Sequence, residues 1–177
     1  MKKVGVIISI IIIYFAIYFL QVNFFSWFNI AGIQPNLFIV LALFLGLYIG
    51  GKYGSIISFF IGLYTDFLFS NSIGITAVIS AIVAYSGDYL EKRFSRDSKI
   101  TMVFMGAIVT AIYEIITIIF NFFRFSVNFN IIAFIKILCL EIIFNAFLII
   151  ILYPLIHKLG MKAESIFKNN KMLTKYF

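Results

Sequence analysis

Apolar runs long enough to cross a lipid bilayer follow one another along almost the entire chain. The first extends from Val4 to Leu20 without a charged residue. A helix rises about 1.5 Å per residue, so about 20 apolar residues match a hydrocarbon core of roughly 30 Å. Of the 177 residues, 63% are hydrophobic and only 12% are charged. The sequence therefore predicts a single integral membrane domain over residues 1–177, surrounded by the lipid bilayer.

Six membrane-spanning helices are predicted from these runs. Their ranges are 4–22, 36–51, 53–69, 73–90, 100–123 and 131–156, followed by a basic cytoplasmic tail over 157–177. Backbone amides inside a bilayer must be paired within the protein, and no run alternates like a barrel strand. The predicted fold class is therefore an all-α polytopic membrane protein. The glycines around Lys52 predict a tight hairpin turn between the second and third helices.

The basic residues predict the orientation of this bundle. Twelve of the 14 Lys and Arg residues lie on the side of the predicted N-terminus, namely Lys2, Lys3, Lys52, Lys92, Arg93, Arg96, Lys99, Lys158, Lys162, Lys168, Lys171 and Lys175. Because Lys and Arg are enriched in cytoplasmic loops, both termini are predicted to lie in the cytoplasm. We expect a multi-pass protein of the bacterial cytoplasmic (inner) membrane. The net charge of +7 then reflects topology and contacts with lipid headgroups, and no nucleic-acid partner is expected.

Four ionisable residues lie within the predicted spans, namely Asp66, Glu114, Lys136 and Glu141. Such residues are costly in a membrane and usually face the interior of a bundle. From the helix rise, Asp66, Glu114 and Lys136 share one depth, roughly 20 Å from the inner face. A buried charge costs less beside its opposite, so we predict an ion pair between Lys136 and either Glu114 or Asp66.

Two polar stripes accompany these residues. The members of the stripe in the fifth predicted helix, at helical spacing, are Thr110, Glu114, Thr117 and Asn121. In the sixth helix, Glu141 and Asn145 share one face. Such stripes must face protein rather than lipid. They predict a structural polar clamp between helices, a docking surface for a partner, or a substrate or ion site.

Small residues at helical spacing predict close contacts between helices in the third and fourth spans. These helix-packing residues are Gly54, Gly62, Gly74, Ala77, Ala81 and Ala84. The sequence contains no Gly-rich phosphate loop, no zinc-binding His/Glu spacing and no nucleophile–base pair. We therefore predict no catalytic residues, no cofactor and no metal.

The segment from Pro35 to Leu90 resembles the rod shape-determining membrane protein family MreD. The residues that carry this resemblance are Pro35-Asn36 opening the second span, Gly54, Gly62 and Asp66 in the third, and Gly74 and Ala84-Tyr85 at the two ends of the fourth. The length of the chain, the six predicted spans and the cytoplasmic termini also agree with this family.

The resemblance implies a non-enzymatic membrane scaffold of the bacterial cell-elongation machinery (the elongasome). Members associate with the bitopic protein MreC and, with MreB and the RodA–penicillin-binding protein synthase, direct lateral peptidoglycan synthesis and the regulation of cell shape. The implied fold is similar to that of the substrate-binding subunits of energy-coupling-factor transporters. The resemblance also implies that Asp66 and the nearby glycines are structural or partner-facing.

Two other functions are consistent with a bundle of this kind. The first is a substrate-binding membrane subunit of an energy-coupling-factor type vitamin transporter. Such subunits commonly carry an Ala-x-x-x-Ala face on the first span, whereas this first span holds only Ala16. The second is an ion-coupled carrier, which usually has helices broken by Gly or Pro in both halves. The two prolines, Pro35 and Pro154, lie near predicted span ends.

Overall fold

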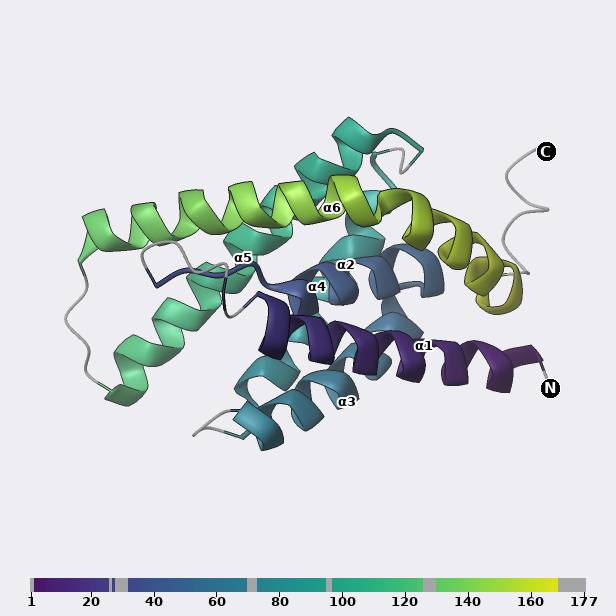
Figure 1. Ribbon diagram of the computed structural model, residues 1–177, viewed down its shortest axis with the longest axis horizontal. Coiled ribbons are helices and arrows are strands. Elements are labelled where there is room, and N and C mark those ends of the chain that lie inside the picture. The colour runs from purple at the N-terminus through teal and green to yellow at the C-terminus, as the bar shows by residue number, and fades with distance from the viewer. Residues whose placement is uncertain are drawn as a thin grey trace.

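The protein folds into a bundle of helices (Figure 1). The computed structural model describes residues 2–25, 27, 32–69, 73–94, 97–125 and 130–168. Its elements are α1 (Lys2–Phe19), the π-helical turn η1 (Leu20–Phe24), α2 (Leu37–Ile49), α3 (Gly51–Phe69), α4 (Ile75–Glu91), α5 (Lys99–Phe125) and α6 (Ile131–Phe167). The predicted all-α fold class is confirmed for this part of the chain, with one helix over each of the six predicted ranges.

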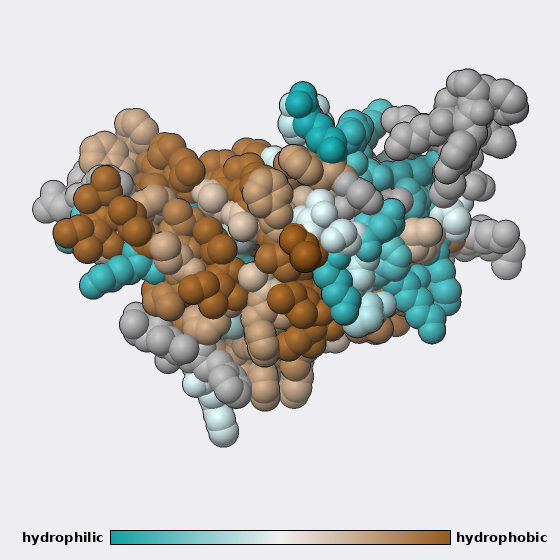
Figure 2. All heavy atoms as spheres, turned by 90° about the horizontal axis from the view of Figure 1, so that it is seen from above, coloured by the Kyte–Doolittle hydropathy of each residue, from teal (hydrophilic) through white to brown (hydrophobic). Residues whose placement is uncertain are grey.

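The beginning of α1 and the end of α6 lie at the same end of the bundle (Figure 1). The ends of α2 and α4 meet α6 there, because Lys168 Nζ donates hydrogen bonds to the Leu47 carbonyl and to Glu91, each at 2.6 Å. Figure 2 shows hydrophilic residues gathered at this end, whereas apolar residues cover most of the rest of that face. We call this end of the bundle the basic end.

Helix α2 occupies the centre of the bundle. Every residue of α2 except Phe38 is buried, as expected for a helix that is apolar on all sides. One side of α2, including Leu43 and Leu47, packs on Met105 and other buried residues of α4, α5 and α6. The opposite side, including Leu41, packs on α1 through residues such as Ile10 and on the remainder of α6.

The helices differ in their capacity to cross a membrane by themselves. Three segments are long and apolar enough, namely Val4–Phe24, Lys99–Arg124 and Ile131–Phe167. Helix α2 is apolar but has only 13 residues, fewer than the predicted range 36–51. At about 1.5 Å per residue it is roughly 20 Å long. The sequence pattern overestimated its length because the flanking turn residues Asn36 and Gly50 are not helical.

Glycines allow the closest contacts between helices. Gly50 joins α2 to α3 with a φ of 94°, which confirms the predicted tight turn and is unfavourable for other residues. A Cβ atom on Gly62 of α3 would lie 2.7 Å from Ala77 Cα of α4, and one on Gly54 would lie 2.6 Å from the Leu45 carbonyl oxygen. Gly74 differs from the packing role predicted for it. It has no neighbour within 4 Å of such a Cβ atom, and its φ of 101° instead serves the turn before α4.

Helix α6 continues beyond the predicted span end at residue 156 and includes Pro154. The first part of the predicted tail is therefore helical, up to Phe167. Its Ala163 and Glu164 are buried, and Gly160 lies against the ring of Tyr48. These contacts explain why α6 continues past residue 156. Burial against α2 stabilises the helical conformation of a segment that the sequence alone predicted to be a water-exposed tail. Residues 169–177 of the predicted tail, and Arg96 among the predicted basic residues, lie outside the described residues.

Candidate functional site

The polar stripes of α5 and α6 lie against each other. Asn145 Nδ2 donates a hydrogen bond of 3.1 Å to Thr110 Oγ1. Asn145 Oδ1 also accepts one of 3.0 Å from the backbone N–H of Asn36, directly before α2. Both side chains are buried, at 1% exposure or less. Asn145 therefore joins three helices, as a polar clamp would.

The next turn of the same contact brings two carboxyl groups together. Glu114 of α5 lies within hydrogen-bonding reach of Glu141 of α6. Glu141 is only 7% exposed, and its Oε2 atom has no hydrogen-bond partner. Thr117 Oγ1, one turn further along α5, is also buried without a partner, while Asn121 is half-buried. This stretch of the α5–α6 contact therefore holds more hydrogen-bonding capacity than it uses.

A cavity of about 520 Å³ opens beside Glu141, at the end of the bundle away from the basic end. It is formed where η1 meets the beginnings of α2 and α4, the end of α3 and the facing parts of α5 and α6. Its polar lining consists of Gln21, Gln34, Asn36, Thr65, Thr76, Tyr113 and Glu141. We call it the polar cavity.

Most of the other polar groups around this cavity are occupied by internal contacts. Gln21 Nε2 donates to the Pro35 carbonyl at 2.7 Å, and Gln21 Oε1 accepts from the Leu37 N–H at 3.0 Å. Asn36 Oδ1 caps α2 by accepting from two backbone N–H groups, and the Asn36 side chain contacts the Tyr113 hydroxyl. The wall is thus fixed by the fold, and Glu141 Oε2 is a buried oxygen of the lining without a partner.

Asp66 has a different role from the ion pair predicted for it. It is 1% exposed, and its carboxylate accepts hydrogen bonds from the backbone N–H groups of Gly74 at 2.8 Å, Thr76 at 3.3 Å and Ala77 at 3.2 Å. These groups begin α4, where N–H groups lack partners within the helix and a negative charge is favourable. Gly74 has no side chain to cap α4, so Asp66 of α3 supplies the cap.

Lys136 does not form the predicted ion pair with Glu114 or Asp66 in the part of the chain that the structure describes. Its side chain is exposed, whereas Glu141, five residues along the same helix, is buried. Residues five apart lie on different faces of a helix. The predicted depth of Lys136 did not determine which way its side chain points around α6.

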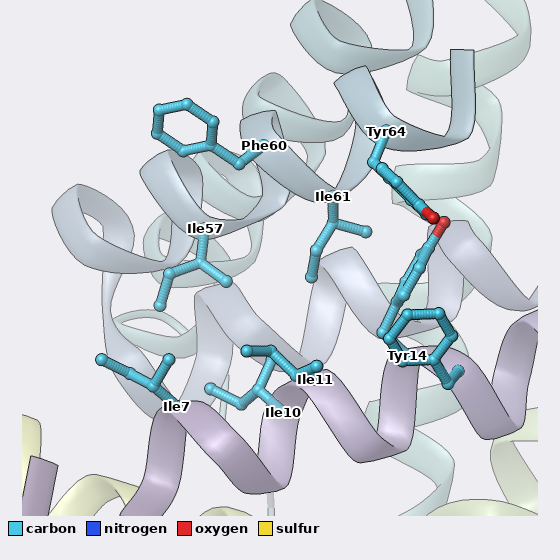
Figure 3. Close-up of a pocket in the computed structure, with 9 residues that line it drawn as sticks. Ile7, Ile10, Ile11, Tyr14, Ile57, Phe60, Ile61 and Tyr64 are labelled. Atoms are coloured by element: carbon cyan, nitrogen blue, oxygen red, sulfur yellow. The ribbon is translucent and has the colours of Figure 1, made fainter. Parts of the chain in front are cut away.

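A groove of about 370 Å³ separates α1 from α3. The residues that line it are Ile7, Ile10, Ile11, Tyr14, Phe15, Ile57, Phe60, Ile61 and Tyr64. Figure 3 shows the isoleucines on its two sides, with Tyr14 and Tyr64 pointing toward one another at one end. Their ring centroids are 5.8 Å apart, and the Tyr14 hydroxyl lies 3.2 Å from Thr65 Oγ1. We call this surface the α1–α3 groove.

Sequence reasoning missed Gln21, Asn36 and Tyr113 as members of the polar cavity. An Asn directly before an apolar run is a helix-start signal, so Asn36 was recognisable as a cap but not as a partner of Asn145. Gln21 and Tyr113 belong to no periodic pattern with Glu141. They meet it only because six elements converge there.

Among the described residues, no group of three or more His, Cys, Asp or Glu side chains could hold a metal ion.

Comparison with known proteins identifies the family. No curated protein and no solved structure matches the chain. The family model for the rod shape-determining protein MreD matches residues 1–163, so the chain belongs to the MreD family of shape-determining membrane proteins.

Proposed function

We propose that this protein is a non-enzymatic scaffold of the cell-elongation machinery, which supports rod shape and lateral peptidoglycan synthesis by binding the membrane helix of an MreC-like bitopic protein. The observation that carries the proposal is the family match over residues 1–163, which gives the chain a role in rod shape determination. MreB and the RodA–penicillin-binding protein synthase are further partners in the same assembly.

In this proposal all six helices cross the bacterial cytoplasmic membrane, with both termini in the cytoplasm. The exposed cations Lys92, Arg93, Lys158 and Lys162 belong to the basic end, as the positive-inside rule requires. The short length of α2 is compatible with a span because protein surrounds it. A helix shielded from lipid on every side does not need to match the full hydrocarbon thickness.

Labelling of single cysteines tests this topology after Cys139, which is exposed, is replaced by Ser. A cysteine at Ile73, before α4, is expected to react with an impermeant maleimide in intact cells. A cysteine at Arg93, after α4, is expected to react only after permeabilisation. Both residues are exposed, so a reversed pattern would contradict the orientation.

The α1–α3 groove is the surface we assign to the MreC-like helix. Its lining is entirely apolar or aromatic, and it runs along two helices of the proposed bundle. Helices associate in membranes by close van der Waals packing, and a groove between two helices offers more contact area than a convex helix face. The paired rings of Tyr14 and Tyr64 limit the groove at one end.

Two neighbouring residues of α1 provide a matched test of this assignment. Ile11 is 49% exposed and lines the groove, whereas Ile12 is 63% exposed and lies outside it. Ile11→Trp is expected to reduce co-purification of the MreC-like protein about tenfold, because the indole fills the groove. Ile12→Trp is expected to leave it unchanged. Equal losses, or none, would remove the groove as the docking surface.

Depletion in the host tests the function itself. Rounded or widened cells are the expected result. Unchanged rods with a defect in vitamin uptake would instead support a transporter subunit.

A further inference from the structure

We propose that the polar cavity is a binding site for a primary ammonium group, with Glu141 as its acceptor. The cavity lies beside the α5–α6 contact and is separate from the α1–α3 groove that we assign to the partner helix. The inference therefore goes beyond the scaffold function and does not depend on it.

The unpaired oxygen of Glu141 is the main observation. This side chain is more than nine-tenths buried, it lines the cavity, and Oε2 has no hydrogen-bond partner. A buried polar group without a partner is unfavourable, and in native proteins it usually indicates a ligand, an ion or a functional site. Internal hydrogen bonds occupy Gln21 and Asn36 on the same wall, so the carboxyl group is the one prepared to receive a donor.

The chemistry of the cavity favours a positively charged donor. The described residues that line it include no Lys or Arg, and Glu114 adds a second carboxyl group beside Glu141. Lys136 is exposed and pairs with neither glutamate in the described part of the chain. Hydrogen bonds between a cation and a carboxylate are about twice as strong as neutral ones. An ammonium group would therefore relieve the unfavourable burial of Glu141.

The geometry distinguishes an ammonium group from other cations. A guanidinium group binds a carboxylate best through two parallel hydrogen bonds, one to each oxygen, whereas the only fully buried Glu141 oxygen without a partner is Oε2. A compact ammonium group needs only one such acceptor. Among the described residues, no group of three or more His, Cys, Asp or Glu side chains could hold a metal ion here.

The position of the cavity allows two sources for this ammonium group. Gln21, Asn36 and Thr76 lie near helix ends that are opposite the basic end. The group could belong to the headgroup of phosphatidylethanolamine or to a small free amine. Both have N–H donors, which the trimethylammonium groups of phosphatidylcholine and choline lack.

The first experiment measures lipids retained by the purified protein. Wild type is extracted from vesicles of equal phosphatidylethanolamine and phosphatidylcholine, and native mass spectrometry counts the bound lipids. Wild type is expected to prefer phosphatidylethanolamine, and Glu141→Gln is expected to reduce this preference about tenfold, the effect of losing one charged hydrogen bond. Glu91→Gln makes the same chemical change at the basic end and is expected to retain the preference.

The second experiment uses soluble probes in detergent without lipid. Ethanolamine is expected to raise the unfolding temperature of wild type but not of Glu141→Gln, with choline inactive, if the source is a free amine. Lipid preference without an ethanolamine effect assigns the site to the headgroup. Identical behaviour of wild type and Glu141→Gln in both experiments, or equal effects of ethanolamine and choline without a lipid preference, overturns the proposal.

A second variant covers the case in which Glu141→Gln does not fold. Val22 lines the cavity at 37% exposure and makes no contact that the acceptor needs, so Val22→Trp narrows the space without changing the carboxyl group. The same loss of ammonium binding is expected. Unchanged binding in a folded Val22→Trp variant would show that the ligand lies elsewhere.

Discussion

The α3–α4 and α5–α6 contacts each contain a buried acid, but the two acids are held in different ways. Asp66 of α3 receives three backbone N–H groups from the start of α4, and glycine places the two helices in close contact. Glu141 of α6 faces another carboxyl group and a cavity, and one of its oxygens has no partner. The acid of the first contact is fully paired, whereas the acid of the second has a buried oxygen without a partner.

The comparison shows that burial alone does not assign a role to an acid inside the bundle. Asp66 lies next to a helix start whose own N-cap residue is glycine, so unpaired N–H groups surround it. Glu141 lies against the middle of α5, where the backbone groups are already paired within the helix. The donors available nearby, rather than the acid itself, decide between a structural cap and an open site.

The largest effect is expected from a substitution that breaks the α3–α4 contact. Gly62→Leu places a side chain 2.7 Å from backbone atoms of Thr76 and Ala77, which cannot move without separating the helices. We expect a loss of about 3 kcal/mol or more in the unfolding free energy, measured by denaturation in mixed micelles. Gly5→Leu is the control, because nothing lies within 4 Å of the added Cβ atom. Equal destabilisation by both would contradict the close contact.

The second-largest effect is expected from a substitution that removes the cap of α4. Asp66→Ala leaves the N–H groups of Gly74, Thr76 and Ala77 buried without an acceptor, and we expect about 2–3 kcal/mol of destabilisation. Asp66→Asn retains one acceptor oxygen and is expected to lose about half as much. The same denaturation experiment measures both variants. A neutral Asp66→Ala variant would show that the cap contributes nothing to stability.

A smaller effect tests the clamp in the α5–α6 contact. Thr110→Val and Asn145→Leu each remove the hydrogen bond between these two side chains. A double-mutant cycle on the unfolding free energy is expected to give a coupling of about 0.6–1 kcal/mol, as for other hydrogen bonds between membrane helices. Asn145→Leu alone is expected to cost more, because Asn145 also accepts from the Asn36 N–H. Strictly additive effects would argue against the clamp.

The smallest effect concerns the ion pair predicted from the sequence. Lys136→Met removes an exposed charge that has no carboxylate partner in the described structure, so we expect a change within about 0.5 kcal/mol. Lys136→Met combined with Glu114→Gln is expected to be additive. A coupling above about 1 kcal/mol in this double-mutant cycle would support the predicted ion pair. The α5–α6 contact would then also hold a paired acid, as the α3–α4 contact does.

Several elements were predictable because their cause is local. The apolar runs predicted a helix over each of six ranges, and Gly50-Gly51 predicted the turn between α2 and α3. The repeat of Thr110 and Glu114 at helical spacing predicted a polar face on α5. The partners of that face were not predictable, because the rotation of each helix about its axis depends on all its neighbours. The incorrect pairing of Lys136 had this origin.

The sequence by itself determined that this chain is helical and apolar and that it resembles the MreD family, and it predicted most of the cations on one side of the membrane. These properties follow from composition, from spacing along the chain and from short motifs. Only the tertiary structure decided that Asp66 caps α4, that α2 is enclosed by the other helices, and that Glu141 faces a cavity with one oxygen unpaired. The physical reason is that hydrogen-bond partners and cavities arise where several helices converge, and convergence is not encoded by the spacing within any one helix.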